Sequence, residues 1–309
     1  MMSSSSPLRP VLGLYGKIPA ERDYVRINAG EFQQAGMDKW FQEGVECLHT
    51  EGTRLPEEPA HFVLLAPGGN AFIGCLRPGE DRVGRSFPLI IAMHLEIAPG
   101  PDALPLLPTI FAPFFTAAAQ LAEQAKAMGT QALAGQVEGL RASLGCSAEL
   151  LSLDELLARS SFFELRVAVG GYDEGAAYAL HTMVTSCRQA QEAGADTAKR
   201  TVTVDCPTPT DGMRIFWLEL VRRLLGSAPV MPSLLWTASR LLVALGPPPA
   251  QLLAYLANPE HKSSRYWPLR TNSPAANAKA GQGLSAEQQR LLGSGQVSLA
   301  GVLAAFAPQ

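Results

Sequence analysis

The sequence predicts an α/β sandwich. Segments typical of strands, which are short apolar runs, alternate along the chain with segments of helical periodicity. Two of the apolar runs flank a glycine-rich turn in the pattern of a β-hairpin. Hydrophobic residues make up 47% and charged residues 17% of the 309 residues. This composition excludes a mainly disordered chain and fits one large domain or two ordinary ones.

The first half of the chain supplies the first predicted strands. One apolar run stops at Gly16, and two more lie on either side of Pro67-Gly68-Gly69-Asn70, where the glycines allow a hairpin turn. A fourth, longer run is typical of a central strand. The predicted strands are Val11–Tyr15, His61–Ala66, Ala71–Leu76 and Leu89–Ile97.

Helical periodicity marks three segments of the first half. In the first, apolar and polar residues fall on opposite faces: Met37, Trp40, Phe41 and Leu48 against Lys39, Gln42, Glu43 and Glu46. The second, Thr116–Met128, is rich in alanine and is predicted to end near Gly129. The third, Gln131–Leu144, is a weaker helix because its glycines lower helix propensity.

The middle of the chain mixes one helix start with two predicted strands. Ser152 and Glu155 have the spacing of a capping box and predict the start of a helix. Phe162–Val169 alternates in part and ends at Gly170-Gly171, so it is predicted as a strand. Thr201–Val204 alternates threonine and valine, which is also typical of a strand.

An amphipathic helix is predicted after Asp211. Its apolar face holds Trp217, Leu220, Val221 and Leu224, and its polar face holds Glu219, Arg222 and Arg223. Two strands and a short helix are predicted next, at Leu234–Thr237, Leu241–Leu245 and Gln251–Ala257. The composition then shifts: Thr271–Gly283 is typical of a linker, and Leu284–Phe306 fits one or two short helices or a disordered segment.

Charge and cysteine content exclude several classes of protein. The net charge of −3 gives no support to a polybasic protein that binds nucleic acid or a membrane surface. The five cysteines are dispersed, so we expect reduced thiols. Ala103–Ala122 carries no charge over a length that could span a bilayer, but its prolines oppose a helix, and we interpret it as a buried loop leading into a core helix. With no secretory signal at the start, we expect a cytoplasmic protein.

Known catalytic and ligand-binding motifs are incomplete or absent. Gly13-x-x-Gly16-Lys17 resembles a phosphate loop, but Val11 replaces its first glycine and Ile18 its magnesium-binding hydroxyl. No histidine lies at metal-ligand spacing from another histidine or a cysteine, so we expect no metal and no cofactor. His181 and Cys187 could form a nucleophile pair only if the fold brought them together.

Two charged loops stand out as a candidate partner site. They are Gly16–Arg26 and Arg77–Pro88, and their basic residues are Lys17, Arg22, Arg26, Arg77, Arg82 and Arg85. Arginine recognises carboxylates and phosphates through paired hydrogen bonds, which suits a partner site. Alternatively, Asp23 and Asp81 pair with these cations and only fix the turns.

Five segments in order resemble the TagF (ImpM) family, which is associated with bacterial type VI secretion. Gly13-x-x-Gly16-Lys17-Ile18-Pro19 with Asp23-Tyr24-Val25 resembles its opening motif. The other four are Trp40-Phe41-Gln42-Glu43-Gly44, Phe62-Val63-Leu64-Leu65-Ala66-Pro67-Gly68, Asp81-Arg82-Val83-Gly84-Arg85-Ser86-Phe87-Pro88-Leu89 and Pro232-Ser233-Leu234-Leu235-Trp236-Thr237. Two positions depart from the family: Arg22 replaces the usual glycine, and Tyr24 replaces phenylalanine.

The resemblance implies a three-layer α/β/α sandwich around a mixed, largely antiparallel sheet. It divides the chain into a TagF-like α/β domain at residues 8–270 and a linker with a C-terminal tail or extra helix at residues 271–309. It also implies a non-enzymatic repressor of type VI secretion assembly that binds the forkhead-associated (FHA) scaffold protein of that system, with no nucleic-acid partner and no stable membrane insertion. The candidate interaction residues are Lys17, Arg22, Asp23, Arg26, Asp81, Arg82 and Arg85.

Two alternatives stay open. The protein could be a structural or assembly component of the secretion machine that touches the inner membrane through Ala103–Ala122. It could also be a hydrolase that uses His181 and Cys187 or a carboxylate pair, provided that those side chains converge in a pocket.

Overall fold

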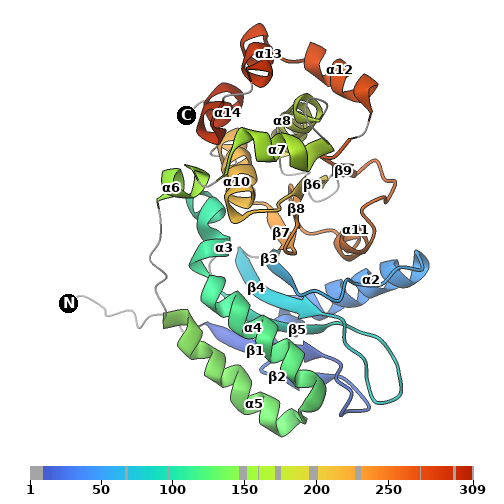
Figure 1. Ribbon diagram of the computed structural model, residues 1–309. Coiled ribbons are helices and arrows are strands. Elements are labelled where there is room, and N and C mark those ends of the chain that lie inside the picture. Colours follow the sequence, from blue (N-terminus) through green and yellow to red (C-terminus); the bar gives the residue numbers. More distant parts are fainter. Residues whose placement is uncertain are drawn as a thin grey trace, which may run out of the picture.

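A computed structural model describes most of the chain (Figure 1). The described residues are 10–66, 69–96, 98–145, 152–158, 160–170, 175–194, 201–226, 231–271, 273–294 and 297–307. Two of the hairpin-turn residues, Pro67 and Gly68, lie outside this set, as do Cys146 and Gly171.

The described residues form a nine-stranded sheet with the order β2-β1-β5-β4-β3-β7-β8-β6-β9. The strands are β1 (Val11–Gly16), β2 (Val25–Ile27), β3 (Ala60–Ala66), β4 (Asn70–Arg77), β5 (Leu89–Leu95), β6 (Thr203–Pro207), β7 (Ser233–Trp236), β8 (Arg240–Ala244) and β9 (Tyr266–Pro268). All neighbours pair antiparallel except β6 and β9, which are parallel. The prediction of a mixed, largely antiparallel sheet is therefore confirmed.

The register of the sheet confirms the predicted hairpin and joins the two halves of the chain. β3 and β4 pair from Ala60 opposite Leu76 to Ala66 opposite Asn70. β3 also pairs with β7, where His61 lies opposite Trp236. One continuous sheet thus combines the strands of the first half with strands from residues 203–268.

Helices cover both faces of the sheet (Figure 1). The α-helices are α1 (Gly30–Gln34), α2 (Met37–Thr50), α3 (Leu107–Ile110), α4 (Ala112–Gln124), α5 (Thr130–Gly139), α6 (Leu153–Ala158), α7 (Phe162–Gly170), α8 (Ala176–Ala193), α10 (Asp211–Leu225), α11 (Leu252–Ala257), α12 (Pro274–Gln282), α13 (Ala286–Gly293) and α14 (Leu299–Phe306). Short 3₁₀ helices occupy Pro101–Leu106 (η1), Ala125–Ala127 (η2) and Leu140–Gly145 (η3).

Alternating side chains of the strands build a separate core on each face. In β4, Phe72 and Leu76 enter the core under α1, α2 and α11, whereas Ile73 and Cys75 enter the core under α4, α5, α7, α8 and α10. Successive residues of a strand point to opposite faces, so an apolar run such as β4 needs cover on both sides. The arrangement is the predicted three-layer α/β/α sandwich.

The prediction of a strand at Phe162–Val169 is wrong, because this segment forms helix α7. Ser161 and Glu164 form a capping box, in which the Ser161 N–H donates to Glu164 Oε2 at 2.7 Å and the Glu164 N–H donates to Ser161 Oγ at 3.2 Å. The buried residues Phe162, Leu165 and Ala168 recur every three positions, which is a helical spacing.

The C-terminal segment is helical where the structure describes it. The stretch interpreted as a linker contains α12, which starts with Ser273 as N-cap and Pro274 in its first turn. α12 packs against α8, and α14 packs against α10 and α6. These contacts add the segment to the helical layer on one face of the sheet (Figure 1).

Helix α10 also departs from its predicted amphipathic pattern, because Glu219 on its polar face is completely buried. Arg222 and Arg223 donate to its carboxylate, with the Arg222 and Arg223 Nε atoms at 2.7 and 2.6 Å. Burial raises the pKa of Glu219, but these hydrogen bonds outweigh it and lower the pKa overall. η1 covers this face, and its Asp102 lies 3.4 Å from Arg222.

The uncharged stretch predicted to lead into a core helix does so. Within the described ranges, no single helix has the length and apolar character to cross a membrane. A pair of helices, Pro101–Ile110 and Ala112–Ala127, meets those criteria together but is bent by 51°. Phe114, Phe115 and Ala118 of α4 are buried in the core, consistent with a core helix.

Candidate functional site

The two charged loops lie at the same end of the sheet because the strands that carry them are neighbours. β1 ends at Gly16 and pairs antiparallel with β5, which the second loop precedes. Gly16 has φ +144°, and a Cβ there would collide with the carbonyl of Pro88. At Gly79, a Cβ would lie 2.6 Å from the Lys17 carbonyl oxygen. Both glycines therefore permit a close approach that a larger residue would prevent.

The carboxylate of Asp81 joins the two loops. Its Oδ2 lies 3.0 Å from Lys17 Nζ and 2.7 Å from Arg85 Nε. Its Oδ1 accepts hydrogen bonds from the N–H groups of Val83 and Arg85, both at 3.0 Å. The Arg85 guanidinium also donates to the carbonyl of Arg22 in the first loop. Lys17 and Asp81 are buried, so this is an internal ion pair and not a surface contact.

The hydrogen bonds determine the charge state of Asp81. Burial raises the pKa of its carboxyl, but the bonds from the Arg85 N–H, Lys17, the Arg85 side chain and the Val83 N–H outweigh burial and hold the pKa well below its usual range. The carboxylate is therefore ionised at neutral pH.

An aromatic cluster packs between the two loops and contributes Tyr24 from the first of them. The rings of Tyr15 and Tyr24 stack at a centroid distance of 5.4 Å, and Phe87 meets both of them edge to face. Lys17 Nζ lies 5.1 Å from the Tyr24 ring centroid, and Arg26 lies 5.3 Å from it. Tyr24, where the family usually has phenylalanine, thus takes part in the same packing.

The candidate residues divide into structural and exposed groups. Lys17 and Asp81 are structural, which confirms that part of the interpretation in which acidic residues fix the turns. Asp23 instead accepts a hydrogen bond from the Tyr24 N–H at 2.8 Å. Arg22, Asp23, Arg26, Arg82 and Arg85 are exposed. Val83, at the tip of the second loop, is 60% exposed.

Arg77 and Arg22 are the two remaining basic residues of the loops whose roles the sequence left open. Arg77 is only partly exposed and pairs with Glu123 of α4 at 2.6 Å. Arg22, which replaces the family's usual glycine, has an ordinary backbone conformation, since among the described residues other than glycine only Asn28 has a positive φ. We call the exposed face made by Arg22, Arg26, Arg82, Val83 and Arg85 the loop surface.

A cavity of about 550 Å³ opens beside the loop surface. One wall comes from the two loops, through Ile18 and Phe87, and the other from the end of α2 and the following loop, through Leu48 and Leu55. Lys126, near the end of α4, lies at its border. This volume lies within the range of roughly 300–1,000 Å³ that is typical of ligand-binding pockets.

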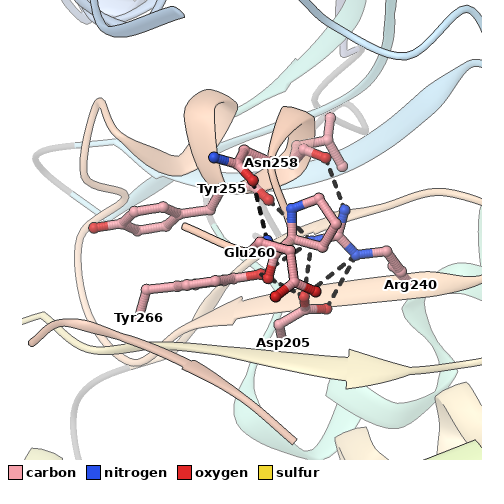
Figure 2. Close-up of polar contacts among 8 residues, drawn as sticks. Asp205, Arg240, Tyr255, Asn258, Glu260 and Tyr266 are labelled. Carbon is pink, nitrogen blue, oxygen red and sulfur yellow. Dashed lines mark hydrogen bonds and ion pairs between the residues drawn. The ribbon is translucent and has the colours of Figure 1, made fainter. Parts of the chain in front are cut away.

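A second polar cluster, which the sequence did not reveal, joins β6, β8 and β9 (Figure 2). Arg240 Nη2 donates to Asp205 Oδ2 at 2.7 Å, and the Tyr266 hydroxyl donates to the same oxygen at 2.6 Å. Arg240 also donates to the carbonyls of Tyr255 and Leu256 at the end of α11, at 2.9 and 2.8 Å. The Tyr255 ring stacks on Tyr266.

The electrostatics of this cluster favour a structural role. Burial raises the pKa of the Tyr266 hydroxyl, and Asp205 raises it further, so the hydroxyl stays protonated and donates. The guanidinium nitrogens of Arg240 donate hydrogen bonds to Asp205, to the Tyr266 hydroxyl and to two backbone carbonyls. The sequence signal that could have revealed the pair is a charged residue in each of two strands, Asp205 within β6 and Arg240 at the start of the otherwise apolar β8.

The candidate nucleophile pair, His181 and Cys187, does not converge. Cys187 is buried, its Sγ lies 3.9 Å from Met183 Sδ, and burial raises the pKa of its thiol to about 12. His181 lies on the same helix, six residues earlier, which places it roughly 120° away around the helix axis; its ring packs at Gly283. The described ranges contain no group of three or more His, Cys, Asp or Glu side chains arranged to hold a metal ion.

Comparison with known proteins gives the class of protein. Residues 13–140 match the family model of the TagF N-terminal domain, described as type VI secretion system-associated. The match covers less than half of the chain, so residues 13–140 are similar to a domain associated with type VI secretion. Over that segment it confirms the resemblance carried by the sequence motifs.

Other comparisons are more distant. A crystal structure of PA0076 from Pseudomonas aeruginosa PAO1 is similar over 82% of this chain and 96% of that chain, with 18% sequence identity and a TM-score of 0.46. No curated protein matches the chain. The matched segment contains most of β1, all of β2–β5 and α1–α5, both charged loops and Asp81.

Proposed function

We propose that this protein is a cytoplasmic, non-enzymatic regulator that represses assembly of the type VI secretion system by binding its FHA-domain scaffold. One observation carries the proposal: the two family-motif loops are joined through Asp81 into one face that displays four arginines. The Lys17–Asp81 ion pair holds together the two loops that carry these arginines, so fewer degrees of freedom of the backbone are lost when a partner docks.

The charge of the loop surface favours an acidic partner. The whole chain has a net charge of −3, whereas the exposed charged residues of the two loops are four arginines and two acidic residues, Asp23 and Glu80. Complementary charge raises the association rate and suppresses wrong partners. Under this proposal, binding weakens as salt is added.

The test is co-elution of the purified protein with the FHA-domain scaffold encoded in the same secretion cluster, with the scaffold phosphorylated and unphosphorylated. A stable complex with either form supports the proposal. No complex with either form, when both proteins are folded, contradicts it. The variant Arg82→Glu then locates the interface, with Arg265→Glu as control, because Arg265 is also exposed but lies just before β9 at the opposite edge of the sheet.

A further inference from the structure

Val83 is an apolar residue that the tip of the second loop holds in solvent. Its exposed fraction of 60% is the largest among the large apolar side chains that the structure describes. It belongs to neither of the two hydrophobic cores, and its neighbours Arg82, Gly84 and Arg85 are exposed as well. The apolar surface of Val83 therefore stays in water unless another molecule covers it.

Hydrogen bonds fix the backbone of this tip. The N–H groups of Asp81 and Gly84 donate to the carbonyls of Arg85 and Asp81, at 3.1 and 2.9 Å, and close the tip on itself. The Asp81 carboxylate accepts the N–H groups of Val83 and Arg85, both at 3.0 Å. The Arg82 N–H donates to a carbonyl of the first loop at 2.7 Å. Every N–H group from Asp81 to Arg85 is thus bonded, which holds the tip in one backbone conformation.

The side chain of Val83 adds little freedom to this fixed backbone. Valine is branched at Cβ, so its single side-chain torsion is restricted to few rotamers. A contact that such a side chain makes costs little conformational entropy, and preorganisation of this kind raises affinity. Val83 therefore has the properties of an anchor residue, by which we mean a side chain that enters a pocket of the partner on docking.

The charges around Val83 are positive on balance. Arg22, Arg26 and Arg82 make no ion pair with any residue that the structure describes, and Arg85 remains exposed although it binds Asp81. The exposed acidic residues of the two loops are Asp23 and Glu80, against four exposed arginines. Since complementary charge is favoured across an interface, the surface that meets Val83 is acidic.

We propose that Val83 is the apolar anchor of the loop surface. Its side chain enters an apolar pocket of the partner, and carboxylates around that pocket contact Arg82 and the other arginines of the loop surface. The inference rests on the proposed function, in that the partner is the one bound at this face. It adds what that partner must present, which is an apolar pocket within an acidic surface.

The anchor and the arginines contribute differently to binding. Sodium chloride screens the contacts between exposed charges, whereas an apolar contact is not screened. The arginines supply orientation and association rate, which any acidic surface would use. The anchor supplies affinity only where the acidic surface also has a pocket for it, which gives selectivity.

The test measures the affinity of the full-length protein for the FHA-domain scaffold by isothermal titration calorimetry, at low and at high sodium chloride. Val83→Thr keeps the shape and the branched Cβ but replaces a methyl group with a hydroxyl. We expect it to weaken binding about tenfold at both salt concentrations, because a hydroxyl enters the apolar pocket. The effect of Arg82→Glu is expected to shrink at high salt.

The matched control is Val167→Thr, the same substitution at another exposed valine. Val167 is 49% exposed on α7 and shares a groove with β6, near the opposite edge of the sheet from β1 (Figure 1). We expect this variant to bind the scaffold as the wild type does. Thermal unfolding checks each fold, and an unchanged Tm is expected for Val83→Thr because its side chain lies outside both cores.

Two results would overturn the anchor and leave the proposed function standing. One is binding of the scaffold by Val83→Thr with the affinity of the wild type. The other is a concentration-dependent dimer of the wild type that Val83→Thr abolishes without a change in scaffold binding, since this would assign Val83 to a second copy of the chain. Failure of the wild type itself to bind the scaffold is a different result, and it would contradict the proposed function and the anchor together.

Discussion

Lys17 Nζ and Asp81 Oδ2 lie 3.0 Å apart, both buried, and connect the loop after β1 to the loop before β5. The two residues come from two separate motifs of the segment that matches the TagF N-terminal domain. Their contact explains why both motifs contain charge next to glycine. The glycines let the backbones approach, and the ion pair satisfies the charges that the approach buries.

The first prediction concerns this ion pair. Lys17→Met removes the buried cation. The carboxylate of Asp81 then keeps only its hydrogen bonds from the Arg85 side chain and from the N–H groups of Val83 and Arg85. Removing one partner of a buried pair is strongly destabilising, so we expect the Tm to fall by about 10 °C. Lys39→Met is the control, since Lys39 is exposed and its pair with Glu43 is weak. Equal Tm values for both variants would show that the buried pair adds nothing.

The second prediction separates Arg82 from Arg85. Arg85 binds Asp81 and the Arg22 carbonyl, whereas the side chain of Arg82 is exposed and only its N–H is used, donating to the Glu21 carbonyl at 2.7 Å. We expect Arg82→Glu to weaken scaffold binding roughly tenfold with an unchanged Tm. Arg85→Glu is expected to lower both affinity and Tm. If Arg82→Glu binds as the wild type does, Arg82 lies outside the interface.

The sequence predicted the fold well where apolar runs were long. All strands of the first half except the short edge strand β2 followed from such runs, because a strand covered on both faces is apolar throughout. Helix α7 was mistaken for a strand because its apolar residues are dense enough to fit either period. Its capping box at Ser161 and Glu164 was the local signal for a helix.

The candidate site was predictable in part. Loop composition identified the charged residues, but which of them are buried depends on strand order, and that order is set by pairings distant in sequence. Glu219 and the pair Asp205–Arg240 were missed for the same reason: their burial comes from η1 and from α11, β8 and β9. Periodicity shows the face of a helix or strand, not what covers that face.

The third prediction concerns the Asp205–Tyr266 hydrogen bond. Tyr266→Phe removes a donor to a buried carboxylate, so we expect a loss of about 2 kcal/mol in the free energy of unfolding. Arg240→Met leaves Asp205 without its cation and is expected to cost about 4 kcal/mol. Tyr255→Phe is the matched control, since its hydroxyl points away from Asp205 (Figure 2). Urea titrations measure all three, and an equal effect of both tyrosine variants would argue against the network.

The fourth prediction is a pH dependence that originates at His61. Burial, with a smaller effect of the positive Arg214, lowers the pKa of His61 from its ordinary 6.5 to about 4. The folded state therefore binds fewer protons than the unfolded state between these values, and stability falls as the pH is lowered through that window. The loss is on the order of 3 kcal/mol when the window has been crossed.

His61→Phe tests this dependence while keeping a ring against Phe115 and Trp236. Other charged groups near His61 are Arg214 and its partner Asp211, and neither is altered. Asp81 acts in a different range, because its pKa is lowered and its contribution is lost only below about 3.9. Urea unfolding between pH 7 and pH 4 should therefore show a flatter stability profile for His61→Phe than for the wild type. Parallel profiles would mean that His61 is protonated equally in the folded and unfolded states.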